Sequence, residues 1–212
     1  MNLKHHLELR NIKLSILGQT LLSLNQTIGP GEPLTVMGPS GSGKSSLLAF
    51  IAGFLPAEFQ AAGQVILDGH DITGVPAERS GVGLLFQDPL LFPHLSVAGN
   101  VRFGIRGGGR EVDREVNDAL AEVGLEGFGL RDPETLSGGQ RARVALVRLL
   151  LSRPRAVLLD EPFSKLDAIL RAEMRSLVFD HLRDYGVPTI LVTHDAADAK
   201  AADGILIKLR VR

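Results

Sequence analysis

The sequence predicts an α/β fold with a mostly parallel sheet, an antiparallel β subdomain near its N-terminus and a helical subdomain. Three observations lead to this prediction. Short apolar runs alternate with helical patterns, which is typical of a parallel sheet covered by helices on both faces. The first third of the chain reads instead as consecutive strands. Between residues 88 and 152 the pattern changes to loops and helices.

The strands are predicted from the spacing of apolar residues. Leu7 to Ile16 follows a spacing close to two residues, with one slip between Leu9 and Ile12, and Leu22 to Gln26 continues the pattern. The later strands are short apolar runs bounded by turn residues. They are expected at Leu34–Met37, Gly63–Asp68, Val82–Phe86, Ala156–Leu159, Thr189–Val192 and Ile205–Leu209.

The helices are predicted from apolar residues that recur three or four positions apart. They are expected at Lys44–Ala52, Val112–Val123, Arg141–Ser152 and Leu166–Tyr185. We therefore expect a single domain over residues 1–212. Its core consists of 1–87 and 153–212, and its helical subdomain of 88–152.

The composition indicates an ordinary globular chain. Of the 212 residues, 44% are hydrophobic and 22% are charged, and the formal net charge of -1 gives no support for nucleic-acid binding. Arg141, Arg143 and Arg148 are interpreted as the solvated side or the signature-helix side of the element Arg141–Ser152 rather than as a nucleic-acid face. The absence of cysteine excludes disulfides and thiolate metal sites. We expect no signal peptide, and the apolar stretch Val144–Leu151 is too short to cross a bilayer.

A glycine-rich loop joins a predicted strand to a predicted helix. Its sequence, Gly38-Pro39-Ser40-Gly41-Ser42-Gly43-Lys44-Ser45, matches G-x-x-x-x-G-K-[ST]. The glycines let several backbone N–H groups converge on one anion, and the start of the helix adds its positive end. Lys44 can reach the β- and γ-phosphates of a nucleotide, and the Ser45 hydroxyl can ligate Mg²⁺. The loop therefore predicts a nucleotide site for ATP and Mg²⁺.

Two adjacent carboxylates follow a later apolar strand. Asp160 ends the run Val157-Leu158-Leu159, where a phosphate-loop enzyme needs a carboxylate for Mg²⁺. Glu161 can orient the attacking water or accept its proton. Alone, the pair can also simply begin a loop before Pro162. Beside the phosphate loop, we interpret it as part of the same site.

A second glycine motif precedes the helix at Arg141–Ser152. In Leu136-Ser137-Gly138-Gly139-Gln140, Ser137 can cap the helix and the glycines leave backbone N–H groups bare. An ordinary helix cap would have the same appearance. A second phosphate site in one chain makes sense if it closes on the γ-phosphate held by another subunit.

Taken together, these motifs resemble the ABC-transporter ATPase family. The resemblance is carried by GPSGSGKSS, Gln87 after an apolar strand, LSGGQ, VLLDEP, the SKLD at Ser164–Asp167 and His194 after TILVT, in the family's order. It spans about Leu7 to Leu209 and implies a P-loop NTPase core. Within the family, the segment Leu84–Val101 resembles the importer type.

The resemblance implies a role for each motif residue. It implies that the nucleotide is held by Gly38, Pro39, Ser40, Gly41, Ser42, Gly43, Lys44, Ser45 and Ser46, and from the opposite subunit by Ser137, Gly139 and Gln140. It implies that Ser45, Gln87 and Asp160 serve Mg²⁺. It assigns catalysis to Glu161 as general base, with His194, Lys44 and Gln87, and places Asp167 at the dimer seam.

The resemblance also implies partners and a location. We expect a second copy of the chain in an ATP-sandwich dimer, an integral membrane permease, an indirect solute-binding protein, and no nucleic acid. The chain would lie peripherally at the cytoplasmic face of the inner membrane and drive uptake of a small solute.

The sequence departs from the family pattern at two places in the site. Ile16 and Leu17 stand where the family usually stacks an aromatic ring on adenine, and Lys165 replaces a small residue.

Three other classes remain as alternatives. A soluble ABC ATPase of DNA repair would carry long coiled coils between Gln87 and Leu136, and one of translation would carry two cassettes. A small-molecule kinase would have no use for LSGGQ. A nucleotide-binding scaffold would differ by lacking ATPase activity.

Overall fold

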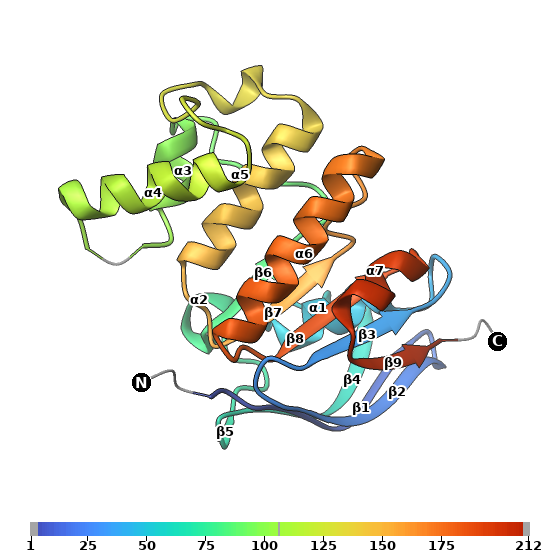
Figure 1. Cartoon of the computed structure of the whole chain (residues 1–212). Helices are drawn as coiled ribbons and strands as arrows, with labels where there is room; N and C mark the ends of the chain where they lie inside the picture. The colour runs from blue at the N-terminus through green and yellow to red at the C-terminus, as the bar shows by residue number, and fades with distance from the viewer. Residues whose placement is uncertain (1–3, 106, 210–212) are drawn as a thin grey trace. The chain divides into compact units, whose positions relative to one another are not determined.

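The fold is described from a computed structural model that covers residues 4–105 and 107–209. Within these ranges, residues 4–84, 155–161 and 175–209 form one compact unit. Residues 85–105, 107–154 and 162–174 form a second unit. Each unit is described by itself, and Figure 1 labels their elements.

The first unit contains an antiparallel sheet built from the N-terminal strands (Figure 1). Its order is β2-β1-β4-β5, with bounds Gln19–Ile28, Leu7–Ile16, Phe59–Leu67 and His70–Asp71. The register of β1 against β2 shifts between Leu9 and Ile12, so the slip predicted from the sequence is confirmed. β4 begins at Phe59, four residues before the predicted start, because the mostly exposed residues 60–64 also pair with β1.

A second sheet has the order β6-β7-β8-β3-β9 (Figure 1). The strands are Val82–Leu85, Ala156–Asp160, Thr189–Thr193, Pro33–Met37 and Ile205–Lys208. The pairs β7–β8, β8–β3 and β3–β9 are parallel, which confirms the predicted parallel sheet. β3, β7 and β8 are nearly continuous apolar runs because helices cover such a sheet on both faces.

Helix α1 (Lys44–Ile51) connects the two sheets through the apolar core. Its Leu47 and Leu48 belong to one cluster of buried side chains with Leu14 of β1 and Val36 of β3. Helix α7 (Ala196–Ala202) packs on β3 and β8, and α2 (Ala77–Ser80) precedes β6. The core therefore lies directly beneath the loop between β3 and α1.

The second unit is helical. It contains α3 (Val97–Arg102), α4 (Arg110–Glu122), a short 3₁₀ turn (Pro133–Thr135) and α5 (Gly138–Leu151). α3 packs on both α4 and α5 through buried apolar side chains. Helix α6 (Ala168–Asp184) begins in this unit and continues into the first. No helix among residues 4–105 and 107–209 is long and apolar enough to cross a bilayer.

Candidate active site

The glycine-rich loop lies between the end of β3 and the start of α1, as predicted. Gly43 directly precedes α1 with φ of 84°, a conformation that side chains rarely adopt. A Cβ on Gly43 would lie 3.2 Å from side-chain atoms of Leu21 and Leu22 on β2. A Cβ on Gly38 would lie 2.8 Å from the Ser42 Oγ. The conformation of the loop therefore depends on glycine at Gly38 and Gly43.

Lys44 is buried at the centre of this loop, with 8% of its surface exposed. Its Nζ donates hydrogen bonds of 2.8 Å to the backbone carbonyls of Gly38 and Pro39. The Ser42 hydroxyl donates to the same Pro39 carbonyl at 2.8 Å and keeps the loop curled. The ammonium thus faces oxygens of its own loop, and phosphate oxygens are the stronger acceptors that can replace them.

Asp160 and Ser45 meet beside Lys44. Asp160 ends β7, and burial raises the pKa of its carboxyl. A hydrogen bond from the Ser45 hydroxyl and the nearby Lys44 charge lower that pKa, whereas the Glu161 charge raises it. A carboxylate and a hydroxyl are hard oxygen ligands, and a divalent cation would offset the cost of burying the charged carboxylate.

Glu161 and His194 also come together. The His194 Nδ1 and the Glu161 Oε1 are 2.9 Å apart. Glu161 has φ of 47°, and its backbone N–H donates to the Val192 carbonyl of β8 at 2.9 Å. A left-handed backbone costs a non-glycine residue about 1–2 kcal/mol. The contact between Glu161, after β7, and His194, after β8, is therefore made with Glu161 in a strained backbone conformation.

Ser137, Gly139 and Gln140 lie together at the start of α5 in the second unit. The Ser137 Oγ accepts from the Gln140 N–H at 3.2 Å, and the Gln140 Oε1 accepts from the Ser137 N–H at 2.9 Å. This reciprocal capping box holds the motif in shape. Gly138 has open space where a Cβ would lie, so the backbone at the start of α5 is open to approach.

Of the remaining predicted residues, Gln87, Asp167 and Lys165 lie in the second unit, whereas Leu17 lies in the first. Gln87 follows β6. Asp167 lies just before α6, where its Oδ1 accepts from the Leu170 N–H at 3.0 Å. Lys165 forms an ion pair with Asp88, the residue after Gln87. Leu17, where an adenine contact was expected, is 96% exposed at the β1–β2 turn.

The arginines of α5 differ from the prediction. They are half-buried, and each donates to a backbone carbonyl within the second unit: Arg141 to Leu136 at 2.7 Å, Arg143 to Val123 at 2.6 Å and Arg148 to Leu90 at 2.8 Å. Burial lowers the pKa of two of them, Arg143 and Arg148. Of the two interpretations, a fully solvated face does not fit, because these side chains hold the backbone of the loops around α5.

Comparisons with known proteins identify the family of the chain. The family model described as "ABC transporter" matches residues 21–164. The chain is 44% identical over 202 residues to the uncharacterized ABC transporter ATP-binding protein YnjD of Escherichia coli K12, covering 93% of the chain and 92% of that protein. It is 46% identical over 205 residues to the thiamine import ATP-binding protein ThiQ of Jannaschia sp., covering 95% and 88%.

A longer relative shows the same match over part of its length. The Fe(3+) ions import ATP-binding protein FbpC of Escherichia coli O157:H7 is 39% identical over 212 residues, which cover 98% of the chain and 60% of that relative. The phosphate loop (residues 38–45) and the adjacent carboxylates Asp160 and Glu161 fall inside the family match. The chain belongs to the ABC transporter family, as an ATP-binding subunit that hydrolyses ATP.

Proposed function

We propose that this ATPase binds ATP with Mg²⁺ in the loop between β3 and α1 and drives import of a small solute through a separate membrane permease. The observation that carries the proposal is the contact of 2.9 Å between His194 and Glu161, next to the Ser45–Asp160 hydrogen bond. The names of ThiQ and FbpC, both import subunits, support the direction of transport.

In this proposal the nucleotide phosphates lie in the hollow of residues 38–46. Lys44 exchanges its two loop carbonyls for phosphate oxygens, and the N–H groups at the start of α1 donate to the same anion. Ser45 and Asp160 would hold the metal. Bound there, Mg²⁺ neutralises charge that develops on the phosphates.

Glu161 then acts on the attacking water as general base. Its side chain is 19% exposed, so water can reach the carboxylate. His194 lies at hydrogen-bonding distance from the Glu161 carboxylate and can turn its other ring nitrogen toward the γ-phosphate. Positioning of the water and of the phosphate does most of the catalytic work.

The second unit would complete the site in a partner copy. Ser137, Gly139 and Gln140 would donate to the γ-phosphate bound by the other subunit, with Asp167 at the seam between the copies. The domain would comprise a core of 1–87 and 153–212 and a helical subdomain of 88–152. That subdomain would contact the permease at the cytoplasmic face of the membrane, with a solute-binding protein engaged indirectly.

The test is expression of the chain with the permease encoded nearest to its gene. The pair should copurify from membranes, and vesicles should accumulate solute when ATP is supplied on the side of the chain. The Lys44→Ala variant should copurify equally and transport nothing. A chain that hydrolyses ATP but copurifies with no membrane protein would favour the soluble ABC ATPase instead.

A further inference from the structure

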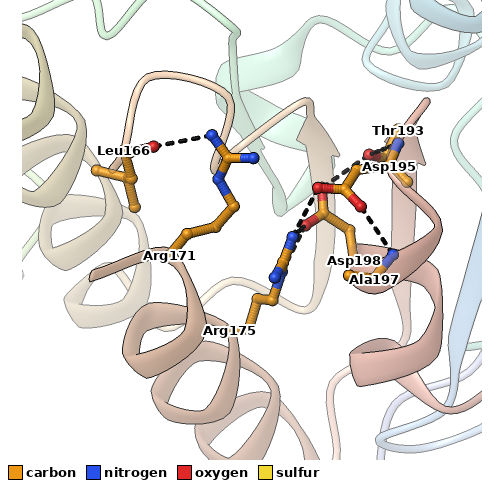
Figure 2. A network of polar contacts seen from close by, with 7 residues as sticks. All are labelled: Leu166, Arg171, Arg175, Thr193, Asp195, Ala197 and Asp198. Atoms are coloured by element: carbon orange, nitrogen blue, oxygen red, sulfur yellow. Dashed lines mark hydrogen bonds and ion pairs between the residues drawn. The ribbon is translucent and has the colours of Figure 1, made fainter. Parts of the chain in front are cut away.

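A buried ion-pair cluster surrounds the backbone of His194, and the site described above does not account for it. Arg175 of α6 donates from Nε to the Asp198 Oδ1 at 2.6 Å and from an Nη atom to the Asp195 Oδ2 at 2.8 Å. The Arg175 side chain is 13% exposed and that of Asp198 is 5% exposed. Figure 2 shows the guanidinium bonded to both carboxylates. One cation thus bridges two residues that follow β8.

The same cluster holds both neighbours of His194. The Thr193 hydroxyl, on the residue before it, donates to the Asp198 Oδ2 at 2.7 Å and accepts from the Asp195 N–H at 3.0 Å. Asp195 is the residue after His194, and its carboxylate caps α7 by accepting from the Ala197 N–H at 2.7 Å. These bonds converge in Figure 2. The backbone on either side of His194 is therefore held by these side chains.

The His194 side chain itself is poorly held by packing. It is 67% exposed, and its Nδ1 lies 2.9 Å from Glu161. An exposed ring meets such a partner reproducibly only if its backbone is held. We propose that Arg175 is a positioning residue for ATP hydrolysis, which acts through Asp195, Asp198 and Thr193 to hold His194 against Glu161. This inference rests on the proposed role of His194.

The chemistry of arginine suits this role. A guanidinium presents several donors in a rigid plane and can bond two carboxylates at once, which an ammonium does less well. Without it, Asp195 and Asp198 would face each other as two nearby negative charges and repel. The loop between β8 and α7 would then open, and His194 would lose its fixed distance from Glu161.

A matched arginine on the same helix provides the control. Arg183 lies two turns further along α6 and pairs with Asp180 of its own helix at 2.7 Å. Its side chain is 40% exposed. Arg175→Met and Arg183→Met therefore make the same substitution on one helix, but only the first removes a bond to the residues around His194.

The experiment is a double-mutant cycle on ATP hydrolysis. His194→Ala should lower kcat by about 100-fold, and Arg175→Met should lower kcat by about 10-fold or more with KM changed less than about threefold. In the His194→Ala background, Arg175→Met should cause no further loss. Arg183→Met should leave kcat unchanged. Additive losses would overturn the proposal for Arg175, whereas an unchanged kcat in His194→Ala would overturn the proposed function of His194.

A second readout needs neither nucleotide nor turnover. In nucleotide-free protein labelled with ¹⁵N at histidine, the ring signals of His194, assigned by their loss in His194→Ala, should report one fixed tautomer. Arg175→Lys keeps the charge and gives a second, milder variant in case Arg175→Met does not fold. It should broaden or shift the His194 signals and lower kcat by about threefold to tenfold. Unchanged ring signals together with unchanged kcat in Arg175→Lys would refute the positioning role.

Discussion

The Glu161→Gln variant tests the assignment of the general base. Glutamine has nearly the same shape as glutamate, and its amide oxygen can still accept from His194 across the present 2.9 Å. Both residues adopt the left-handed backbone at φ of 47° with similar strain. The substitution thus removes basicity and leaves the geometry in place.

The size of the effect follows from this difference. Loss of a positioned general base costs about 10²- to 10⁴-fold in rate, or about 3–5 kcal/mol of transition-state stabilisation. The bond to His194 is exposed at its histidine end, so its change alters the free energy of unfolding by less than about 1 kcal/mol. For a chain of this size, that corresponds to a melting temperature within about 4 °C of the wild type.

The assay combines phosphate release with light scattering after gel filtration. Glu161→Gln should release phosphate at least about 100-fold more slowly, melt like the wild type and form a dimer in ATP and Mg²⁺ that persists. The exposed Glu58→Gln is the matched control and should behave like the wild type. A kcat within threefold of the wild type would refute the base assignment. A variant that stays monomeric in saturating ATP would refute the sandwich.

Three further substitutions test other parts of the structure. Lys44→Ala should weaken ATP binding by about 100-fold in calorimetry, because the ammonium that would exchange its two loop carbonyls for phosphate oxygens is lost; an affinity close to wild type would contradict the loop assignment. Burial raises the Asp160 pKa, so its stabilising contribution is present at acidic pH and is lost as pH rises through the folded-state value. Asp160→Asn should therefore melt higher than the wild type at neutral pH, with the difference shrinking in acid, and should lose Mg²⁺-dependent stabilisation by ATP. A lower melting temperature at neutral pH would show that burial of the charge is not unfavourable there. Asn100 is fully buried and bonds both the N–H and the carbonyl of Phe92, so Asn100→Ala should cost about 3 kcal/mol in urea unfolding while ATP affinity stays unchanged.

The parts of the candidate site whose place in the fold can be predicted from the sequence are those fixed by neighbouring residues. The phosphate loop is defined by closely spaced glycines, Lys44 and Ser45 between one strand and one helix. All of these residues lie within eight adjacent positions, so the sequence alone predicts the loop. Asp160 was placed because a carboxylate after a buried parallel strand must lie at the edge where such sheets bind ligands. Sequence motifs are enough to predict a contact when the residues involved are joined by a single turn.

Contacts across the fold could not be predicted in the same way. Arg175 lies on a long helix, with the pattern of an ordinary charged surface position, and its bond to Asp198 depends on how that helix packs beside β8. The left-handed backbone of Glu161 leaves no mark in the sequence, because glutamate has no preference for that conformation. The short elements α2, α3 and α7 were also missed, since four to seven residues carry too little periodicity to identify a helix.

The central claim is that Lys44 exchanges its loop carbonyls for nucleotide phosphates. The direct measurement is a crystal structure of the chain with Mg²⁺ and a non-hydrolysable ATP analogue. The account predicts phosphate oxygens within hydrogen-bonding distance of the Lys44 Nζ, and the metal on the Ser45 hydroxyl near Asp160. A structure in which Lys44 still bonds Gly38 and Pro39, with the nucleotide bound elsewhere, would contradict it.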